Sequence, residues 1–318
     1  VIRNAYIILS SEDEELLEGI YDVLSFRDTS QAYTWGGRFD VNKVKIVRFA
    51  KYVKDLDLPS LKIPIGFLDF ITSILEEYEH SVIDKRPKVQ EIRYAENKVR
   101  LKGINLREHQ VDAIIKAIET RRGIVMSPTG SGKTEVFLAI LSMLEQPSLV
   151  VFNRQQLAQQ TVSRAQARGL DAGLVQGKNV MEKKITMATI QSIHKIEDLK
   201  KYNNLILDEV HHVGSKSYQD MLKLSHWHRM YGFSATPVNP HKMDLKSAKI
   251  IANVGPVIFD ANAKQLIDKG IIAKPTIYMV PITQPDEIEE FDFQTAEEVG
   301  IKHNKYRHEI IKELAEMN

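Results

Sequence analysis

The chain has 318 residues, a net charge of +1, 43% hydrophobic and 27% charged residues, and no cysteine. This is the composition of a folded globular protein with room for two domains, and it excludes a disulfide framework and a thiolate zinc site. No apolar stretch approaches the roughly 20 residues that span a bilayer, and the acidic run after Leu9 is wrong for a signal peptide. We therefore expect a cytoplasmic protein without a membrane partner.

The first 85 residues predict a small domain of mixed α and β structure. Tyr6–Leu9 is an apolar run typical of a buried strand, and Val44–Phe49 alternates polar and apolar residues as a half-buried strand does. Glu12–Leu24 and Gly66–Tyr78 have the apolar spacing of amphipathic helices. Two strand patterns and two helix patterns within 85 residues indicate an α+β domain.

Residues 86–103 predict a linker or an exposed hairpin, because they contain Pro87 and many charged side chains. The stretch from Asp84 to Lys102 is locally basic, with seven Lys or Arg residues against three Asp or Glu. A net charge near zero neither indicates nor excludes a nucleic-acid partner, since the local distribution of charge matters more than the sum. This stretch is one place where such a partner would be attracted.

From residue 104 onward, strand and helix patterns alternate. Short apolar runs predict strands at 123–127, 148–152, 185–189, 204–208 and 230–234. Helical spacing predicts helices between them at 134–144, 154–168 and 218–224. This alternation predicts a mostly parallel sheet covered on both faces, with its ligand site at the carboxyl ends of the strands.

A glycine-bearing loop, Ser127–Thr134, lies between the first of these strands and the first helix. Strand, loop and helix in this order predict a phosphate-binding P-loop, in which backbone N–H groups face phosphate oxygens. Lys133 is placed to reach the terminal phosphates, and the Thr134 hydroxyl is placed to hold Mg²⁺. Ser127 stands where a leading glycine is usual. The other loop residues expected at the nucleotide are Pro128, Thr129, Gly130, Ser131 and Gly132.

Two adjacent carboxylates, Asp208 and Glu209, end the apolar run Leu205–Leu207. In a phosphoryl-transfer site the first carboxylate holds Mg²⁺, and the second orients and deprotonates the attacking water. Two solvated acids at a strand end are the alternative, but a P-loop upstream favours the catalytic interpretation. His211 and His212 follow, and we expect no zinc there because adjacent residues on an extended end point in opposite directions.

Two further segments complete a pattern. Ser234-Ala235-Thr236 follows the apolar stretch Met230–Phe233, and Leu106–Gln110 opens a helix upstream of the P-loop. With the P-loop, D-E-x-H and S-A-T in this order and spacing, residues 104–280 resemble the first motor domain of a superfamily-two helicase. The resemblance implies an α/β fold, namely a RecA-like P-loop NTPase domain with a mostly parallel sheet, preceded by the small α+β domain of residues 1–85.

The flanking segments narrow the resemblance. Gln265–Pro275 is similar to the segment that leaves the first motor domain in XPB-like, type I restriction and phage UvsW-type helicases, and Phe26–Asp84 resembles the small N-terminal domain of phage branch-migration helicases. The resemblance implies an ATP- and Mg²⁺-dependent DNA helicase or translocase. It would act as a monomer on duplex, forked or branched DNA in replication, recombination or repair, in a phage-infected or bacterial cytoplasm.

The resemblance also implies roles for individual residues. Gln110 would hydrogen-bond the adenine edge, with Arg107 beside it. His211 would couple the acid pair to the S-A-T segment by hydrogen bonding. The expected catalytic residues are Lys133, Asp208, Glu209 and His211, and the expected coupling residues are Ser234, Ala235 and Thr236. The expected DNA contacts are Trp35, Arg38, Arg154, Thr189 and Gln191. For Trp35 a place in the core of the small domain is an equal alternative.

The end of the chain carries a further expectation. Asn304–Ile311 predicts a helix, which in this superfamily opens the second motor domain, and the chain stops at Asn318. The glycine-arginine segment that reaches the γ-phosphate from that domain is absent from the sequence. Since an arginine finger is worth roughly 10³–10⁵ in rate, we expect residues 281–318 to be a connection and a truncated second domain, and this chain alone to hydrolyse ATP poorly.

Two other functions remain open from the sequence. An RNA helicase is the enzymatic alternative, although Val210 and His211 stand where the DEAD-type quartet would continue. A non-catalytic nucleic-acid-binding platform, with the P-loop acting as an ATP switch, is the alternative from another class.

Overall fold

The computed structural model describes residues 1–32, 39–54, 56–89, 91–144, 146–236, 238, 243–276, 279, 295 and 297–316. The chain divides into two compact units, Val1–Ile272 and Ala273–Asn318. The smaller unit holds a π-helical turn, Glu298–Lys302, and the helix α10, Lys305–Glu316, which confirms the helix predicted near the tail. No helix in the described part of the chain is long and apolar enough to cross a membrane.

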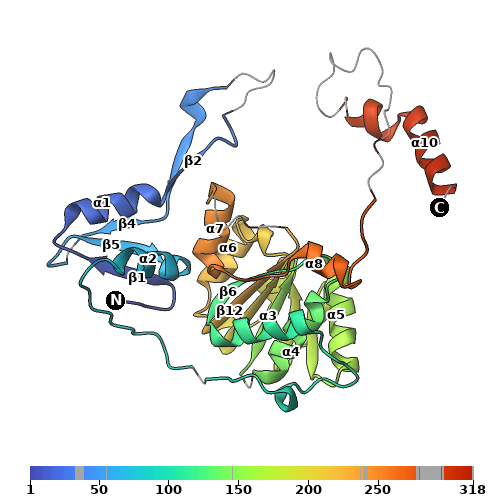
Figure 1. Cartoon of the computed structure of the whole chain (residues 1–318), viewed down its shortest axis with the longest axis horizontal. Coiled ribbons are helices and arrows are strands. Elements are labelled where there is room, and N and C mark those ends of the chain that lie inside the picture. Colours follow the sequence, from blue (N-terminus) through green and yellow to red (C-terminus); the bar gives the residue numbers. More distant parts are fainter. Residues whose placement is uncertain are drawn as a thin grey trace. The chain divides into compact units, whose positions relative to one another are not determined.

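The first part of the larger unit is a small α+β domain, as the sequence predicts (Figure 1). Its strands are β1 (Tyr6–Ser10), β2 (Ser25–Asp28), β3 (Lys45–Arg48), β4 (Lys51–Val53) and β5 (Ser60–Pro64), and its helices are α1 (Glu14–Val23) and α2 (Leu68–Leu75). Antiparallel pairing joins β1, β5 and β4 into one sheet and β2 and β3 into a separate two-stranded ribbon. A 3₁₀ turn, Ile65–Phe67, leads from β5 into α2.

An eight-stranded sheet follows, with the strand order β13-β6-β12-β11-β7-β10-β8-β9. All neighbouring pairs are parallel except the terminal pair of β8 and β9. The strands are β6 (Arg122–Met126), β7 (Ser148–Phe152), β8 (Ala172–Gln176), β9 (Asn179–Val180), β10 (Ile185–Thr189), β11 (Asn204–Asp208), β12 (Arg229–Ser234) and β13 (Val257–Asp260). The five predicted strands are present to within a residue at each end, and β8, β9 and β13 were not predicted.

The helices of this part lie on both faces of the sheet, as the alternation of elements requires (Figure 1). They are α3 (Glu108–Glu119), α4 (Lys133–Met143), α5 (Gln155–Ala167), α6 (Lys216–Lys223), α7 (Leu245–Val254) and α8 (Ala263–Asp268). The three helices predicted after the P-loop correspond to α4, α5 and α6. Helices α3, α4 and α5 bury their apolar residues in one core, and α6 and α7 bury theirs in the other.

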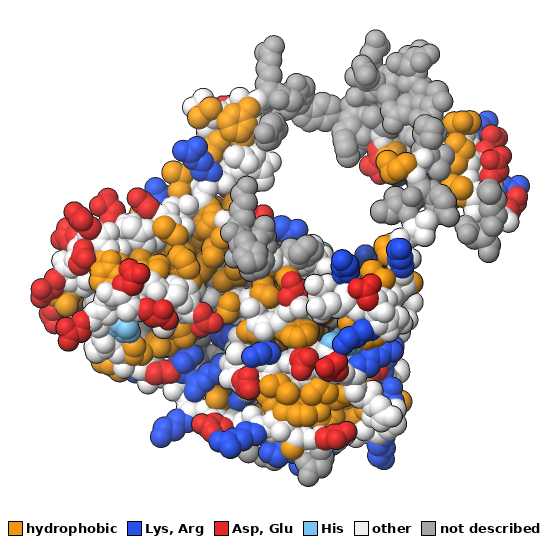
Figure 2. Space-filling view, in the orientation of Figure 1, with side chains coloured by type: hydrophobic (Ala, Val, Ile, Leu, Met, Phe, Trp, Pro, Cys, Tyr) orange, Lys and Arg blue, Asp and Glu red, His pale blue; other side chains and the backbone are white. Residues whose placement is uncertain are grey.

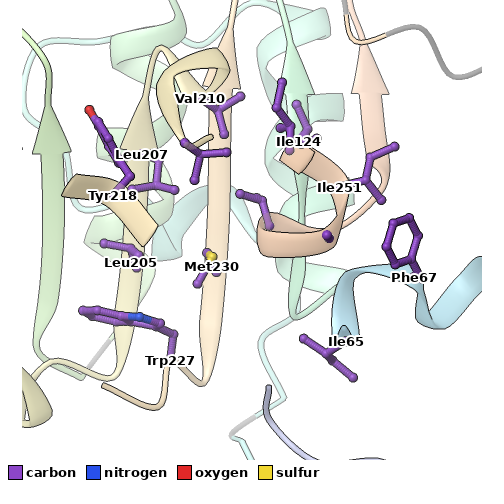
Figure 3. Close-up of a cluster of buried hydrophobic side chains, with 14 of the residues drawn as sticks. Ile65, Phe67, Ile124, Leu205, Leu207, Val210, Tyr218, Trp227, Met230 and Ile251 are labelled. Carbon is purple, nitrogen blue, oxygen red and sulfur yellow. The ribbon is translucent and has the colours of Figure 1, made fainter. Parts of the chain in front are cut away.

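Successive strand residues divide between these two cores, as the alternation of side chains along a strand demands. Ile124 belongs to the core with α6 and α7, whereas Val125 belongs to the core with α3 and α4. The first of these cores continues into the small N-terminal domain. Figure 3 shows Ile65 and Phe67 of that domain approaching Ile251 of α7, close to Ile124. The small domain is therefore packed on the sheet domain by a shared apolar core.

Gly66 lies at the centre of this shared packing. It sits in the 3₁₀ turn that contacts α7, and a Cβ atom added to it would lie 1.8 Å from the carbonyl oxygen of Ile251. Since no side chain fits in that space, the backbone of the turn lies directly against the backbone of α7. Glycine is required here for close approach.

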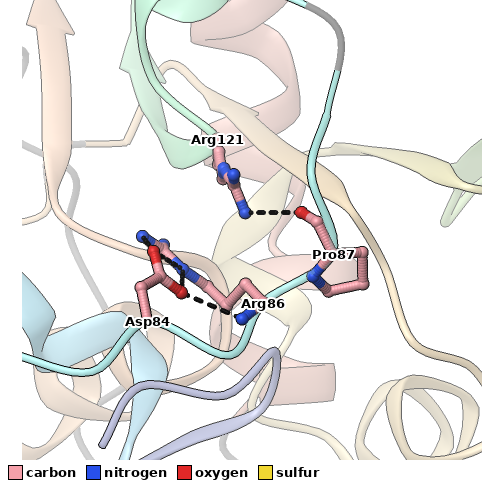
Figure 4. Close-up of polar contacts among 4 residues, drawn as sticks. All are labelled: Asp84, Arg86, Pro87 and Arg121. Carbon is pink, nitrogen blue, oxygen red and sulfur yellow. Dashed lines mark hydrogen bonds and ion pairs between the residues drawn. The ribbon is translucent and has the colours of Figure 1, made fainter.

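The segment that joins the two parts is fixed where it begins. The Arg86 guanidinium donates to both carboxylate oxygens of Asp84 and holds the pKa of that carboxyl down at about 2. Arg121 of the sheet domain donates to the carbonyl of Pro87 at 3.1 Å (Figure 4). Of residues 86–103, those that the structure describes contain one 3₁₀ turn, Glu96–Lys98, and no strand. The interpretation of residues 86–103 as a linker or an exposed hairpin stays a prediction.

Candidate active site

Three predicted motifs meet at the carboxyl edge of the sheet. Strand β6 leads into the P-loop, β11 ends in the acid pair, and β12 ends in the S-A-T segment, and these three strands are neighbours in the order β6-β12-β11. The Ser127 N–H donates to the carbonyl oxygen of Ser234 at 2.9 Å, so a backbone hydrogen bond joins the P-loop to the S-A-T segment. This is the edge at which open α/β sheets bind ligands.

The P-loop has the backbone conformation that its glycines permit. Gly130 and Gly132 have φ angles of +84° and +90°, in the region that favours glycine. Gly132 also has no room for a side chain, because a Cβ atom there would lie 2.2 Å from the Nε2 atom of Gln110. Helix α4 begins directly after it at Lys133, so the first N–H groups of the helix face the loop.

Ser127, at the position where a glycine is usual, holds the loop from within. Its hydroxyl lies 2.5 Å from the hydroxyl of Ser131, which itself donates to the carbonyl of Pro128 at 2.7 Å. The Lys133 ammonium donates to the Ser127 carbonyl at 3.2 Å. The side chain that would neutralise phosphate charge is therefore held in the loop, and it remains half-buried.

Gln110 is turned into the P-loop. Its side chain is only 4% exposed, and its amide nitrogen lies 3.2 Å from the Ser131 carbonyl and 3.4 Å from that of Gly132. Its amide oxygen accepts from the Arg107 N–H at 2.9 Å. In this arrangement the amide braces the loop, and its predicted contact with adenine stays a prediction. The Arg107 side chain is exposed at the start of α3.

His109 contacts the same loop and was not singled out from the sequence. Its Nε2 atom lies 3.0 Å from the Ser131 carbonyl. A second missed contact joins Asn153 after β7 to His212, with 3.1 Å between the Asn153 Nδ2 and His212 Nε2 atoms. The sequence contains only a weak indication of these two contacts. Each joins residues at the edges of motifs, and the partners lie 22 and 59 residues apart in the chain.

The surroundings of the acid pair disfavour the ionised form of Asp208. Burial, and then the neighbouring Glu209 carboxylate, raise the pKa of Asp208 to about 6, and the Lys133 ammonium partly opposes this. Glu209 has φ +51°, and it is the one residue other than glycine with positive φ in the part of the chain that the structure describes. Such backbone strain is held only where the surrounding structure enforces it, and it is concentrated at functional sites.

His211 stands between the acid pair and the S-A-T segment. Its Nδ1 atom lies 3.3 Å from Glu209 Oε2 and 3.3 Å from the hydroxyl oxygen of Ser234. Burial is the main cause that lowers the pKa of His211, followed by the charge of His212, and Glu209 opposes them. The Ser234 hydroxyl also accepts from the Thr236 N–H at 3.0 Å. One chain of contacts therefore runs from Glu209 through His211 to the S-A-T segment.

The residues suit Mg²⁺ bound together with a nucleotide. The half-buried Asp208 carboxylate, whose ionised form an added positive charge would stabilise, and the hydroxyl of Thr134 are oxygen donors of the kind Mg²⁺ takes beside substrate phosphates. No cluster of three or more His, Cys, Asp or Glu side chains suited to a metal occurs among the described residues. The metal would then depend on the nucleotide for much of its coordination.

The residues predicted to contact DNA differ in their exposure to solvent. Arg154 and Gln191 are exposed at the carboxyl edge of the sheet, and Gln191 reaches toward the carbonyl of Asn153. Thr189 is fully buried, and its hydroxyl donates to Ser192 at 3.1 Å, so a phosphate at this edge would meet Arg154 and Gln191 first. Trp35 and Arg38 lie outside the described residues. None of these contacts is tested by the structure.

Comparisons with known proteins place this geometry in context. Residues 103–239 match the family model described as "Type III restriction enzyme, res subunit". A protein named DNA 3'-5' translocase XPB2, from Sulfurisphaera tokodaii, is 33% identical over 171 residues, which cover 53% of this chain and 38% of the relative. A protein named putative ATP-dependent RNA helicase L396, from Acanthamoeba polyphaga mimivirus, is 31% identical over 141 residues, which cover 41% of this chain and 27% of the relative.

One solved structure has a similar fold over most of the chain. The crystal structure of the UvsW helicase from bacteriophage T4 matches with a TM-score of 0.55 and 15% sequence identity, covering 77% of this chain and 93% of that one. At this identity the likeness shows the fold alone. The chain spans less than two fifths of the length of the two relatives named above.

Proposed function

We propose that the chain contains the first motor domain of a superfamily-two helicase and is the ATP-binding part of an ATP-dependent motor that moves along DNA. The family-model match over residues 103–239 and the similarity to the Sulfurisphaera translocase support this proposal. The observation that carries this proposal is the convergence of P-loop, acid pair and S-A-T segment at one edge, joined through His211. The name of the Sulfurisphaera relative, a DNA translocase, supports DNA as the partner.

The proposed chemistry divides between named side chains. Lys133 leaves the Ser127 carbonyl and neutralises charge on the terminal phosphates of ATP. Glu209 accepts a proton from the attacking water, and the positive φ of its backbone, +51°, supports a functional role for this residue. Thr134 and Asp208 would hold Mg²⁺, which supplies positive charge to the phosphates when bound. His211 and Ser234 relay the change at Glu209 to the segment after β12.

The finer substrate assignment rests on the sequence resemblance. We propose duplex, forked or branched DNA as the track and recombination or repair as the process, with the protein acting as a monomer. Arg154 and Gln191 are exposed to contact such a track. An RNA track is the second candidate, and the name of the mimivirus relative favours it.

ATP hydrolysis by the native protein that carries this chain tests the proposal. With duplex or branched DNA present, turnover should rise well above the level without nucleic acid, and equal stimulation by matched RNA would favour the second candidate. Glu209→Gln should bind ATP normally and lower turnover by roughly 10²–10⁴, the usual worth of a positioned base. The exposed Glu119→Gln serves as the control. No stimulation by any nucleic acid would contradict the motor assignment.

A further inference from the structure

A small cavity lies where the small domain meets the amino ends of β6 and β12. Its volume is about 210 Å³, and its wall includes Ile65 of the small domain, Trp227 and Met230 of the sheet domain (Figure 3), and Arg122. Arg122 is the first residue of β6, whereas the P-loop follows the last residue of the same strand. The cavity and the candidate nucleotide site are therefore at opposite edges of the sheet.

The cavity is lined without a carboxylate, although the small domain beside it is acidic. Residues 1–85 contain 15 Asp or Glu against 10 Lys or Arg, and acids gather on and around α1 (Figure 2). Of the described residues, Arg122, Lys223 and His226 line the cavity and no Asp or Glu does. Lys223 is exposed, and its ammonium lies 3.4 Å from Asp220, which is not part of the wall. An anion that entered the cavity would meet positive charge there and no carboxylate.

The Arg122 guanidinium is half-buried and has few partners. Within the described part of the chain its side chain makes no ion pair and one hydrogen bond, at 3.0 Å to the carbonyl oxygen of Asn253 in the last turn of α7. This contact uses Nη1 and caps the helix, but it leaves Nε and Nη2 without an acceptor. Burial, and then the charge of Arg86, lower the pKa of Arg122 to about 10, so the group stays charged at neutral pH. A charge held in this way is costly unless a counter-ion pairs with it.

Two more donors close to Arg122 lack acceptors. Ser225 is 8% exposed and lines the cavity, and its hydroxyl makes no hydrogen bond with a described residue. Trp227 is 2% exposed, and its indole N–H is buried without an acceptor. Because buried donors in folded proteins are normally paired, several unpaired donors in the wall of one cavity indicate a ligand that supplies oxygen acceptors.

We propose that this cavity binds a small free anion of the phosphate type. Arg122 would donate from Nε and Nη2 to two of its oxygens, and the Ser225 hydroxyl would donate to a third. The planar fork of a guanidinium matches phosphate in this two-point manner. The cavity is smaller than the roughly 300–1,000 Å³ of pockets for drug-sized ligands, which favours a free anion over a nucleotide. Asn4 and Ile65 also line it, so the anion would lie against both domains.

The test separates this cavity from the P-loop, which also has donors for phosphate. Inorganic phosphate is titrated by calorimetry into the chain carrying Lys133→Ala, which lacks the P-loop cation, at constant ionic strength set with chloride. Arg122→Gln and Ser225→Ala are then added singly to this background. The matched control is Arg121→Gln, because Arg121 is also half-buried but donates to the carbonyl of Pro87 and does not line the cavity. MgATP affinity of each variant, measured without Lys133→Ala, reports whether it is folded.

The Lys133→Ala chain should bind inorganic phosphate. Arg122→Gln should weaken that affinity at least ~10-fold, the usual loss for a hydrogen bond to a charged group. Ser225→Ala removes a hydrogen bond from an uncharged donor and should weaken it about 2- to 10-fold. Arg121→Gln should stay within about twofold of the parent, as a matched change of charge outside the cavity. A 20-base-pair DNA duplex should bind the wild type and Arg122→Gln equally, because the ligand is a free anion.

Several outcomes would overturn the phosphate proposal. These are no phosphate binding by the Lys133→Ala chain, unchanged affinity in a folded Arg122→Gln or Ser225→Ala variant, or an equal loss in Arg121→Gln. A loss of duplex affinity in Arg122→Gln would assign the cavity to DNA instead. If Arg122→Gln unfolds because the cap on α7 is lost, Ser225→Ala decides alone, since it leaves that cap intact. The motor proposal fails separately, through absent MgATP binding by the wild type.

Discussion

Replacing Gly66 with alanine tests whether the small domain and the sheet domain share one core. The added Cβ would lie 1.8 Å from the carbonyl oxygen of Ile251 and within 3 Å of two backbone carbons of α7. Carbon atoms prefer separations of about 3.5–4.0 Å, and no side-chain rotation relieves a contact with backbone. The turn or the helix must therefore move by more than an ångström.

Overpacking of this kind costs about 1–3 kcal/mol, and the backbone contact places Gly66→Ala at the upper end. For a unit of this size about 3 kcal/mol lowers the melting temperature by roughly 6–12 °C. The matched control is Gly19→Ala, since nothing lies within 4 Å of a Cβ at Gly19 in helix α1. Alanine there should stabilise the chain by about 0.5–1 kcal/mol.

Thermal and urea unfolding of the wild type and both variants measures the melting temperature and the free energy of unfolding of each. The shared core requires that Gly66→Ala unfolds earlier and Gly19→Ala unfolds at the wild-type temperature or later. If Gly66→Ala melts within a degree of wild type, the turn does not pack against α7 as described, and the small domain is held by other contacts.

Two further predictions concern the nucleotide site. Gln110→Ala removes the hydrogen bonds between the Gln110 amide and the P-loop carbonyls. If Gln110 also hydrogen-bonds adenine, calorimetry should show a larger loss of affinity for ATP than for GTP. Equal losses would mean that Gln110 only supports the loop. Asp208 has a pKa raised to about 6 from an ordinary 3.8, so its favourable contribution to folding is complete below about pH 3.8 and is lost as the pH rises through 6. Asp208→Asn should therefore stabilise the Mg²⁺-free chain at pH 8, by up to about 3 kcal/mol, and have little effect at pH 4. Denaturant titration at both pH values measures the change in the free energy of unfolding. Equal changes at pH 8 and pH 4 would contradict the raised pKa of Asp208.

Five strands of the sheet and the P-loop could be predicted because their signals are local. β7, β10 and β11 are mostly apolar and are buried on both faces over nearly all of their length, and the loop glycines stand at fixed spacing after β6. Strand β8 was missed because Gly173 weakens its pattern. That glycine is needed for a contact distant in sequence, since a Cβ there would lie 2.2 Å from the Met181 carbonyl oxygen.

Other features were beyond sequence reasoning because they depend on tertiary contacts. The contact of the buried Gln110 amide with the Ser131 carbonyl joins residues 21 apart in the chain, and the predicted contact of Gln110 with adenine stays a prediction. The positive φ of Glu209 is imposed by its surroundings, since no local preference of glutamate favours it. The continuity of the core from Phe67 to Ile251 joins residues far apart in the chain.

The central claim is that the loop from Ser127 to Thr134 binds the phosphates of ATP through Lys133. Titration calorimetry of MgATP into the wild-type chain, Lys133→Ala and the exposed control Lys116→Ala tests it directly. Because a hydrogen bond to a charged group is worth about 1.5–3 kcal/mol, affinity should fall about 10- to 150-fold in Lys133→Ala and stay unchanged in Lys116→Ala. Equal affinity in Lys133→Ala and the wild type would contradict the assignment of this loop as the ATP site.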